Sequence, residues 1–393
     1  MSGSGPACEQ GARCGDGVKA AWEQCDDGNQ VDDDRCANDC TGNRFDNSFI
    51  ASGGYHLCIL RNGQVWCSGN NRDGQLGDGT RTQRTVPVRV ANLSDVVEVT
   101  TQSNSSCARR RDGTVWCWGN NDIGQLGTGN TTDQLTPQRL GSLSDIKAIG
   151  SMGNSGCAIK PDGSVWCWGY GIYGQLGNGS TSNQDSPRRV GSLRGMTKVT
   201  GGNYHACAKG AGPELFCWGR NRYGEVGDNT MTTRTTPVQV TVVDDILDFS
   251  VGGYHTCVLR HDGTVRCFGD NSYGGFGIGN TSGGPSARTM IGVTDVVELS
   301  AAHHGTCVRQ GNSQMYCAGW YYHVGTGNES NQYSPQRINL GGNVRRIFSG
   351  AGVEGAAAER EDGTVWTWGR NHYGQLGIGS TDNNLSPGRV SGF

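Results

Sequence analysis

Paired cysteines recur along this chain with a period of about fifty residues. The pairs are Cys58 with Cys67, Cys107 with Cys117, Cys157 with Cys167, Cys207 with Cys217, Cys257 with Cys267, and Cys307 with Cys317. In the last repeat both partners are missing together, because Ala357 and Thr367 occupy the two positions. This joint loss indicates six disulfides, one within each of six repeats. Short strands and glycine turns at this period predict a solenoid or a closed propeller rather than a catalytic α/β domain.

The turn residues between the paired cysteines fix the register of the two strands that carry them. Asn62-Gly63 is typical of a two-residue type I′ hairpin, because both residues tolerate positive φ. Residues 160–164 instead predict a three-residue turn with a left-handed glycine, and the additional loop residue widens the cysteine spacing. Both turns place the cysteines opposite each other at a non-hydrogen-bonded pair, where the Cα atoms lie close enough for a disulfide.

Each repeat contains segments for about four strands. The second strand of each hairpin ends in a Val-Trp-Cys-Trp-Gly pattern, as at Val115–Gly119, and both of its faces are apolar. A strand such as residues 95–99 precedes the hairpin, and a proline-containing edge strand such as residues 85–90 follows it. Residues 44–393 hold seven such repeats. The sequence therefore predicts an all-β fold, a seven-bladed β-propeller with one disulfide in six blades.

A second pattern, Trp-Gly-x-Asn-x-x-Gly-Gln-Leu-Gly, follows each hairpin and is intact at residues 118–127 and 368–377. In the third repeat Gly171 replaces the asparagine, and both residue types readily adopt the left-handed conformation, so we expect a backbone constraint there. With this run and a Gly-x-x-His before the hairpin, the repeat resembles the regulator of chromosome condensation family of seven-bladed propellers. Repeat six departs most, because its segment 318–325 is shortened and lacks both Asn and Gln. Across the gap in the ring, residues 386–393 and 45–51 are expected to pair.

The N-terminal residues have a different composition from the repeats. Residues 1–7 are expected to be a flexible N-terminus or a cloning remnant, and residues 8–43 a small acidic module rich in cysteine. Four of its cysteines are spaced as a disulfide framework: Cys14, Cys25, Cys36 and Cys40. A module of this size needs disulfides or a metal to hold it together.

This module resembles the cysteine-rich repeat of myxobacterial secreted proteins, which is itself similar to Notch-type repeats. The resemblance implies that calcium is bound by an acidic loop, because calcium prefers clustered carboxylate oxygens. The candidate ligands are Asp26, Asp27, Asp32, Asp33 and Asp34. The alternative is a disulfide knot with a solvated acidic surface.

The seventeen cysteines also indicate a cellular compartment. Evenly spaced pairs and a cysteine-rich module suit an oxidising environment, so we expect a secreted or cell-surface protein. Cys8 has no counterpart in the four-cysteine motif, and an intermolecular disulfide or a free thiol would account for it. No stretch approaches the roughly 18 apolar residues that a membrane helix requires, so no membrane span is expected.

The charge pattern argues against nucleic acid as a partner, because the net charge is −3 and no basic run is present. An enzyme is not expected either, since no Ser/His/Asp order, phosphate loop or zinc spacing occurs. His303 and His304 are candidates for facing the channel of the propeller. Three other histidines share a consensus position before a cysteine and are expected to be structural: His56, His205 and His255.

A binding function is favoured, because propellers present variable loops from every blade on one rigid face. The segment 320–323 breaks the repeat template and is the first candidate for contact. Tyr, Trp and Arg are the residue types that anchor interfaces, and they make up most of the predicted partner contacts: Tyr170, Arg220, Arg222, Trp320, Tyr321, Tyr322, His323, Arg370 and His372. One recurring aromatic position is predicted to pack between blades: Tyr173, Tyr223, Tyr273 and Tyr373.

The sequence thus favours a secreted, non-enzymatic protein that binds a protein partner, in the manner of an inhibitor. The resembled family includes secreted bacterial propellers that inhibit β-lactamases through an aromatic-rich loop face, although these lack the disulfides and the N-terminal module. A self-assembling structural component of the cell surface or matrix is the second hypothesis. A carbohydrate-binding lectin is the third, because exposed Trp and Tyr also suit a glycan.

Overall fold

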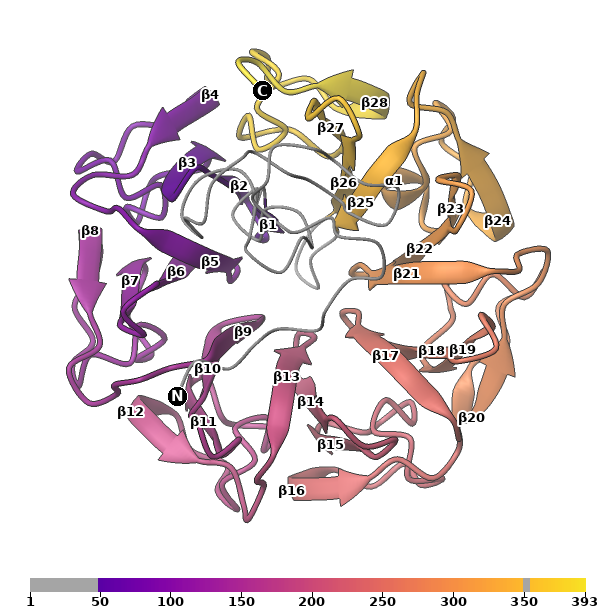
Figure 1. Ribbon diagram of the computed structural model, residues 1–393, viewed down its shortest axis with the longest axis horizontal. Coiled ribbons are helices and arrows are strands. Elements are labelled where there is room, and N and C mark those ends of the chain that lie inside the picture. The colour runs from indigo at the N-terminus through magenta and orange to yellow at the C-terminus, as the bar shows by residue number, and fades with distance from the viewer. Residues whose placement is uncertain (1–48, 349–353) are drawn as a thin grey trace, which may run out of the picture.

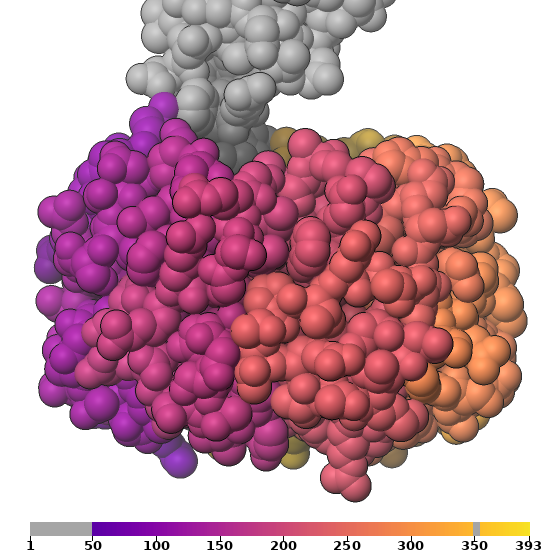
Figure 2. All heavy atoms as spheres, turned by 90° about the horizontal axis from the view of Figure 1, so that it is seen from below, coloured from indigo at the N-terminus to yellow at the C-terminus, as the bar shows by residue number. Residues whose placement is uncertain are grey.

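The computed structural model describes residues 49–348 and 354–393, which form seven sheets around a central axis (Figure 1). Each sheet has four antiparallel strands, and their order follows the chain, so each blade is one continuous stretch of sequence. The predicted all-β, seven-bladed propeller is confirmed. Seen from the side, neighbouring blades pack into a continuous rim (Figure 2). We number the blades 1 to 7 in chain order.

The strands of a blade run outward from the axis (Figure 1). The innermost strands are β1 (Phe49–Ser52), β5 (Val96–Thr101), β9 (Ala148–Met152), β13 (Met196–Gly201), β17 (Ile246–Val251), β21 (Val296–Ala301) and β25 (Val344–Phe348). The second strands are β2 (His56–Arg61), β6 (Ser105–Arg110), β10 (Ser155–Ile159), β14 (His205–Gly210), β18 (His255–Arg260), β22 (Gly305–Gln310) and β26 (Gly355–Arg360). The third strands are β3 (Gln64–Gly69), β7 (Val115–Gly119), β11 (Val165–Gly169), β15 (Leu215–Gly219), β19 (Val265–Gly269), β23 (Met315–Gly319) and β27 (Val365–Gly369). The outermost strands are β4 (Arg84–Arg89), β8 (Gln134–Arg139), β12 (Gln184–Arg189), β16 (Arg234–Gln239), β20 (Gly284–Thr289), β24 (Gln332–Ile338) and β28 (Asn384–Arg389).

The paired cysteines lie opposite each other on the second and third strands of six blades. Cys58 faces Cys67 across β2 and β3, and their Cα atoms are 4.1 Å apart, as a close non-hydrogen-bonded pair requires. The other five bonded pairs have the same Cα separation of 4.1 Å: Cys107 with Cys117, Cys157 with Cys167, Cys207 with Cys217, Cys257 with Cys267, and Cys307 with Cys317. The six predicted disulfides are therefore confirmed. In blade 7, Ala357 and Thr367 occupy the same cross-strand positions.

The hairpin turns have the predicted backbone conformations. Asn62 and Gly63 both have positive φ, at 51° and 70°, as a type I′ turn demands. Gly163 has φ of 70°, the left-handed glycine of the three-residue turn. Both turn types leave the cysteines in register, so loop length varies between blades without changing the position of the disulfide.

In blades 2, 3, 4 and 7, the tryptophan of the Trp-Gly step joins the blade to the one before it. Trp118 is fully buried, and its indole N–H donates to the carbonyl of Gln75 in blade 1 at 2.9 Å. A Cβ added at Gly77 would lie 2.8 Å from Trp118 Nε1, so a glycine is required for this approach. Indoles in three later blades make equivalent bonds of 2.8–3.0 Å: Trp168, Trp218 and Trp368.

The ring closes differently from the predicted pairing of residues 386–393 with residues 45–51. Among the described residues, β28 pairs with β27 and β1 pairs with β2, because each blade takes all four strands from one repeat. Blades 1 and 7 meet through side chains instead. The Phe393 ring packs edge-on against Trp66 at 6.2 Å, and the Arg61 guanidinium lies over Phe393 at 5.1 Å.

Blade 6 contains the single helical turn of the described residues, α1 (Tyr321–Val324). The turn ends at Gly325, which has φ of 76°, and it takes the place of the longer loop of the other blades. No helix in residues 49–348 or 354–393 is long and apolar enough to cross a membrane.

The predicted N-terminal module at residues 8–43 lies outside the described residues. Its four-cysteine framework and the proposed calcium ligands from Asp26 to Asp34 therefore stay predictions, as does the fate of Cys8.

Candidate binding face

Two sets of loops emerge at the same end of every blade. In an antiparallel sheet of four strands, the loop between the first and second strands and the loop between the third and fourth lie at one end. The hairpin turn lies at the other end. We call the end with the two loops the loop face. The variable positions after the Trp-Gly steps therefore meet, at this face, the residues that precede each second strand.

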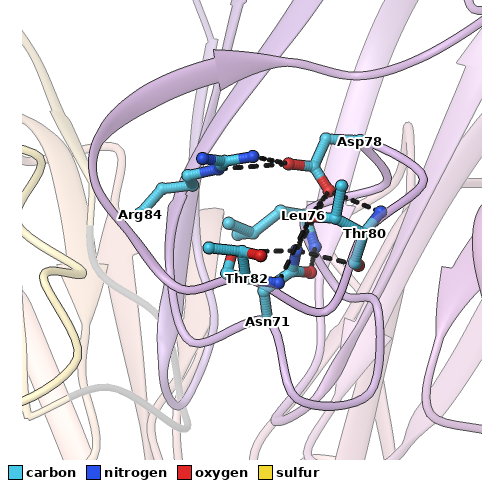
Figure 3. Close-up of polar contacts among 6 residues, drawn as sticks. All are labelled: Asn71, Leu76, Asp78, Thr80, Thr82 and Arg84. Carbon is cyan, nitrogen blue, oxygen red and sulfur yellow. Dashed lines mark hydrogen bonds and ion pairs between the residues drawn. The ribbon is translucent and has the colours of Figure 1, made fainter.

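A buried asparagine holds the loop between the third and fourth strands (Figure 3). The Asn71 amide donates to the Thr80 carbonyl at 3.0 Å, and its oxygen accepts from the Leu76 backbone N–H at 3.0 Å. The same amide donates to the Asp78 carboxylate at 3.0 Å, which also pairs with Arg84 at 3.0 Å. These bonds close the loop around one side chain, so the residues at its surface have a fixed position.

Two of these bonds, to the backbone carbonyl nine residues later and from the backbone N–H five residues later, recur around the equivalent side chains Asn121, Asn221, Asn271 and Asn371. None of these asparagines has positive φ, and neither does Gly171, so the predicted left-handed constraint is wrong. The asparagine is needed for its side-chain hydrogen bonds. In blade 3, a Cβ added at Gly171 would lie 2.2 Å from the Ser182 carbonyl oxygen, so the chain has closed into the vacated space.

A continuous line of aromatic rings crosses the loop face over blades 3 to 6. It runs from Tyr170 to Tyr322, and the centroids of successive rings are 4.3–6.3 Å apart. Rings at these separations attract one another beyond their burial alone. We call this set the aromatic band: Tyr170, Tyr173, Tyr204, Tyr223, Tyr254, Tyr273, His303, His304, Trp320, Tyr321 and Tyr322.

A guanidinium group lies near the middle of the band. The Arg220 guanidinium carbon is 5.4 Å from the Tyr204 ring, 5.3 Å from the Tyr223 ring and 5.4 Å from the Tyr254 ring. Arg222 lies over Tyr223 at 5.9 Å. Cation–π contacts at exposed sites contribute about 0.5–1 kcal/mol each, so three rings hold Arg220 in one orientation.

Most of the predicted partner contacts lie together at this band. Those that the structure brings into it are Tyr170, Arg220, Arg222, Trp320, Tyr321 and Tyr322. Arg370 lies in blade 7 and forms an ion pair with Glu354, so its charge is already compensated. His372 is exposed on the same loop of blade 7, outside the band.

His323 does not belong to the exposed surface, which corrects its assignment as a partner contact. Its side chain is completely buried, at 0% exposure. In blade 6, Gly305 stands where the consensus histidine is found, and a Cβ added there would lie 2.9 Å from His323 Cβ. The His323 ring thus packs into space that opens because the consensus histidine is absent.

Other members of the band were not among the predicted contacts. Three of them share one repeat position, immediately before the second strand: Tyr204, Tyr254 and His304. The recurrence of an aromatic residue there in three successive repeats could have identified this position from the sequence. Three of the four consensus tyrosines bridge blades as predicted, since Tyr173 contacts Tyr204, Tyr273 contacts His304, and Tyr373 contacts Tyr55. Tyr173, Tyr223 and Tyr273 are also more than a third exposed, at 36–38%.

The consensus histidines join blades beneath the loop face. His56 Nε2 bonds to the Ser106 hydroxyl of blade 2 at 2.7 Å, and His205 and His255 make equivalent bonds of 3.0 Å to threonines of the following blades. Burial lowers the pKa of His56 and His205 to about 3 and that of His255 to about 4. All three are therefore neutral at physiological pH, which supports the structural role expected of them.

His303 and His304 do not line the channel. They belong to the band, where His304 stacks on Tyr254 with ring centroids 5.4 Å apart and an interplanar angle of 19°. Burial lowers the pKa of His303 to about 3 and that of His304 to about 4, so both act as neutral rings. His304 takes the place that tyrosine has in blades 4 and 5.

The innermost strands enclose an axial cavity of about 490 Å³. Its charged side chains are already paired with one another or with neighbouring strands. Glu98 accepts from Arg109 at 2.9 Å and from the backbone N–H of Ile149 at 3.1 Å, and Lys198 pairs with Asp248 at 2.7 Å. No group of three or more His, Cys, Asp or Glu side chains suited to a metal occurs in the described part of the chain. The loop face is therefore the stronger candidate for a binding site.

Comparison with known proteins agrees with this architecture. A family model described as the RCC1-like domain matches residues 14–353, and a model of the regulator of chromosome condensation (RCC1) repeat matches residues 362–393. Among curated proteins, the ultraviolet-B receptor UVR8 of Arabidopsis thaliana is 37% identical over 68 residues, or 17% of this chain and 16% of that protein. The match thus spans less than a fifth of that relative.

Several solved structures share the fold. Yeast RCC1 (Prp20) bound to Kap60 has a TM-score of 0.73 and 16% identity, covering 95% of this chain and 91% of that one. A second structure, of Prp20p from Saccharomyces cerevisiae, has a TM-score of 0.69 and 22% identity, covering 77% of this chain and 80% of that one. Human WBSCR16 has a TM-score of 0.68 and 20% identity, covering 77% of this chain and 85% of that one. At these identities the likeness establishes the fold and leaves function to the residues of the loop face.

Proposed function

This chain belongs to the RCC1-like domain family, and from that premise we propose that it is a non-enzymatic binding protein that engages a protein partner through the aromatic band. The observation that carries the proposal is the uninterrupted run of partly exposed rings across blades 3 to 6, of which the loops in blades 4 and 5 are held by the buried side chains of Asn221 and Asn271. Tyr, Trp and Arg are the residue types that dominate binding energy in interfaces. Rigid rings lose little conformational entropy on binding, which favours affinity.

Two further considerations support a protein partner. Two of the solved structures of similar fold concern proteins that bind other proteins. Prp20p was characterised for its binding to Gsp1p and histones, and yeast RCC1 was solved in complex with Kap60. The six disulfides suit an oxidising compartment, so we place the partner outside the cell, as a secreted or surface protein.

The proposal is tested by removing exposed rings from the band. The variant Tyr173→Ser/Tyr223→Ser/Tyr273→Ser loses three side chains that are each more than a third exposed. Wild-type and variant proteins are immobilised, exposed to the medium and surface fraction of the source cells, and the captured proteins are quantified by mass spectrometry. We expect the wild type to enrich a partner that the variant retains at one tenth or less.

A matched control removes exposed apolar side chains outside the band. Val86→Ser/Leu247→Ser/Val297→Ser alters three residues of similar exposure on strands β4, β17 and β21, and should capture the partner as the wild type does. Equal capture by the band variant and the wild type would refute the proposal. A glycan array with the same proteins tests the lectin alternative: a glycan bound by the wild type and lost by the band variant would support it.

The assembly alternative depends on the N-terminal module and Cys8, and it calls for a different measurement. Size-exclusion chromatography with and without reductant detects a disulfide-linked oligomer. A discrete oligomer that dissociates on reduction would support a structural role. A monomer under both conditions, together with partner capture, supports the binding role that we propose.

A further inference from the structure

The Arg220 guanidinium has aromatic neighbours but no anionic partner in the described part of the chain. It lies 5.3–5.4 Å from three tyrosine rings, and no carboxylate of the described residues is within ion-pairing distance. Arg222, two residues later, has the same status over Tyr223. A guanidinium group that is held by rings on a binding face, without an ion pair of its own, is available to pair with an anionic group of a ligand.

The equivalent arginine of blade 7 is compensated within the protein. Arg370 occupies the same repeat position as Arg220 in blade 7 and pairs with Glu354. In blade 4 itself, Arg234 at the start of β16 pairs with Asp228 at 2.6 Å. Blade 4 has Tyr204 near Arg220 where blade 7 has Glu354, so a ring contacts Arg220 at the position from which a carboxylate pairs with Arg370.

The carboxylates nearest in the fold are engaged in other ways. Glu225 is almost completely buried beneath the band and accepts from the Tyr223 backbone N–H at 2.7 Å. Asp270 accepts from the backbone N–H of Ser272 at 3.1 Å and from its hydroxyl. Burial raises the pKa of Glu225 more than the nearby Arg220 lowers it, and neither carboxylate forms an ion pair with Arg220 or Arg222.

We propose that the partner supplies a carboxylate to Arg220, from an Asp or Glu side chain flanked by apolar residues that pack on the neighbouring rings. This inference deepens the proposed function and rests on it. A planar guanidinium pairs with a carboxylate through two parallel hydrogen bonds, and the rings beneath it fix the direction of those bonds. A charge pair with rings around it is also shielded from solvent, which strengthens it.

The distribution of charge favours an acidic protein segment over an acidic polysaccharide. The two unpaired guanidinium groups both lie at Tyr223, and the remainder of the band consists of uncharged rings. A polysaccharide with a carboxylate on every sugar would meet cations in one place and uncharged rings along the rest of its path. A protein segment with one acidic position among apolar ones matches this pattern.

A library of random twelve-residue peptides on phage tests the proposal with the full-length protein. We expect peptides selected on the wild type to contain Asp or Glu among apolar residues. The affinity of the synthesised peptides should fall roughly tenfold or more with Arg220→Met or when the peptide's acid is changed to its amide. The two changes together should cost little more than either alone. Arg220→Lys keeps the charge without the planar fork, so its loss should be smaller.

Arg288→Met is the matched control, because it removes one exposed arginine from β20, outside the band. It should bind the selected peptides as the wild type does. Selected peptides without an acid, undiminished binding by Arg220→Met, or no selection at all would overturn the inference. So would binding of polygalacturonate that Arg220→Met abolishes, since this would assign the site to a glycan. Loss of binding in the ring variant but not in Arg220→Met would refute the carboxylate contact while the binding face itself stands.

Discussion

At the scale of single residues, the most unusual substitution in the repeat is Glu225. It stands at a loop position that holds glutamine in four other blades: Gln75, Gln125, Gln175 and Gln375. Gln175 accepts from the backbone N–H of Tyr173 at 2.9 Å, and Glu225 makes the same contact with Tyr223. The hydrogen bond needs only an acceptor, and the desolvation cost of the negative charge on Glu225 exceeds its attraction to Arg220.

Glu225→Gln is predicted to stabilise the protein, and more so at high pH. Burial raises the pKa of Glu225 to about 7 from its usual 4.5. Because the folded pKa is raised, the folded protein holds the proton that the unfolded chain releases above pH 4.5, and stability falls as the pH rises through 7. Denaturant unfolding should show a gain on the order of 2 kcal/mol at pH 8 and little gain at pH 4.5. The reverse change, Gln175→Glu, should destabilise with the same pH dependence; a gain independent of pH would contradict the account.

Residue identities predicted contacts well where a position has one role and poorly where it has two. The asparagine of the loop was recognised as necessary, but its reason was misassigned. Asparagine suits both positive φ and several side-chain hydrogen bonds, and the sequence alone does not distinguish these two uses. His323 failed for a related reason. Its burial depends on the absence of a side chain at Gly305, which is distant in sequence and visible only once the strands are paired.

At the scale of the element, each hairpin is stabilised by one disulfide in six blades and by none in the seventh. Blade 7 shows that Ala357 and Thr367 suit the same cross-strand pair, and the Thr367 hydroxyl donates to the Leu376 carbonyl at 2.7 Å. The variant Cys157→Ala/Cys167→Thr copies this arrangement into blade 3. The blade should therefore fold, and the loss reflects only the cross-link.

This double variant should lose about 2–3 kcal/mol of unfolding free energy, because a closed loop of this length restricts the unfolded chain by that amount. Denaturant unfolding at equilibrium measures the change. The reciprocal variant, Ala357→Cys/Thr367→Cys, should add a seventh disulfide and raise stability. Equal stabilities of wild type and both variants would show that the unfolded hairpin is already formed without the bond.

The elements were predictable from sequence because turn chemistry and cysteine spacing repeat along the chain and agree with one another. Asn62-Gly63 and the Asp-Gly turns specify hairpins of known length, and proline marks the outermost strands. The helical turn α1 was not predicted. The blade 6 loop lost the asparagine that organises the other loops, and the remaining Tyr321–Val324 segment has no pattern long enough to indicate a helix.

At the scale of the whole molecule, the interface between blades 1 and 7 holds the ring closed without a shared strand. Phe393 contributes to it through Trp66 and Arg61. Phe393→Ala should destabilise the protein by about 1–2 kcal/mol, since an edge-on ring pair and a cation–π contact are both lost. Hydrogen exchange should quicken in β2 and β27 and stay unchanged in β14, on the far side of the ring.

Phe393→Leu is the control, because it keeps most of the apolar volume and should show a smaller effect. Quickened exchange in all seven blades alike would contradict a local closure.

The closure and the aromatic band were difficult to predict from sequence for the same reason. Both are contacts between repeats, and a repeat pattern specifies what happens within one unit far better than what its neighbours present to it.

Because every blade takes its four strands from one stretch of chain, each repeat is at once a sheet, a hairpin unit and a sector of the disc. Duplication or loss of a repeat during evolution would add or remove a whole sector and leave no half-built sheet behind. The same independence explains how one sector carries a shortened loop and another has discarded its sulfur atoms, while the remaining sectors keep their inherited form.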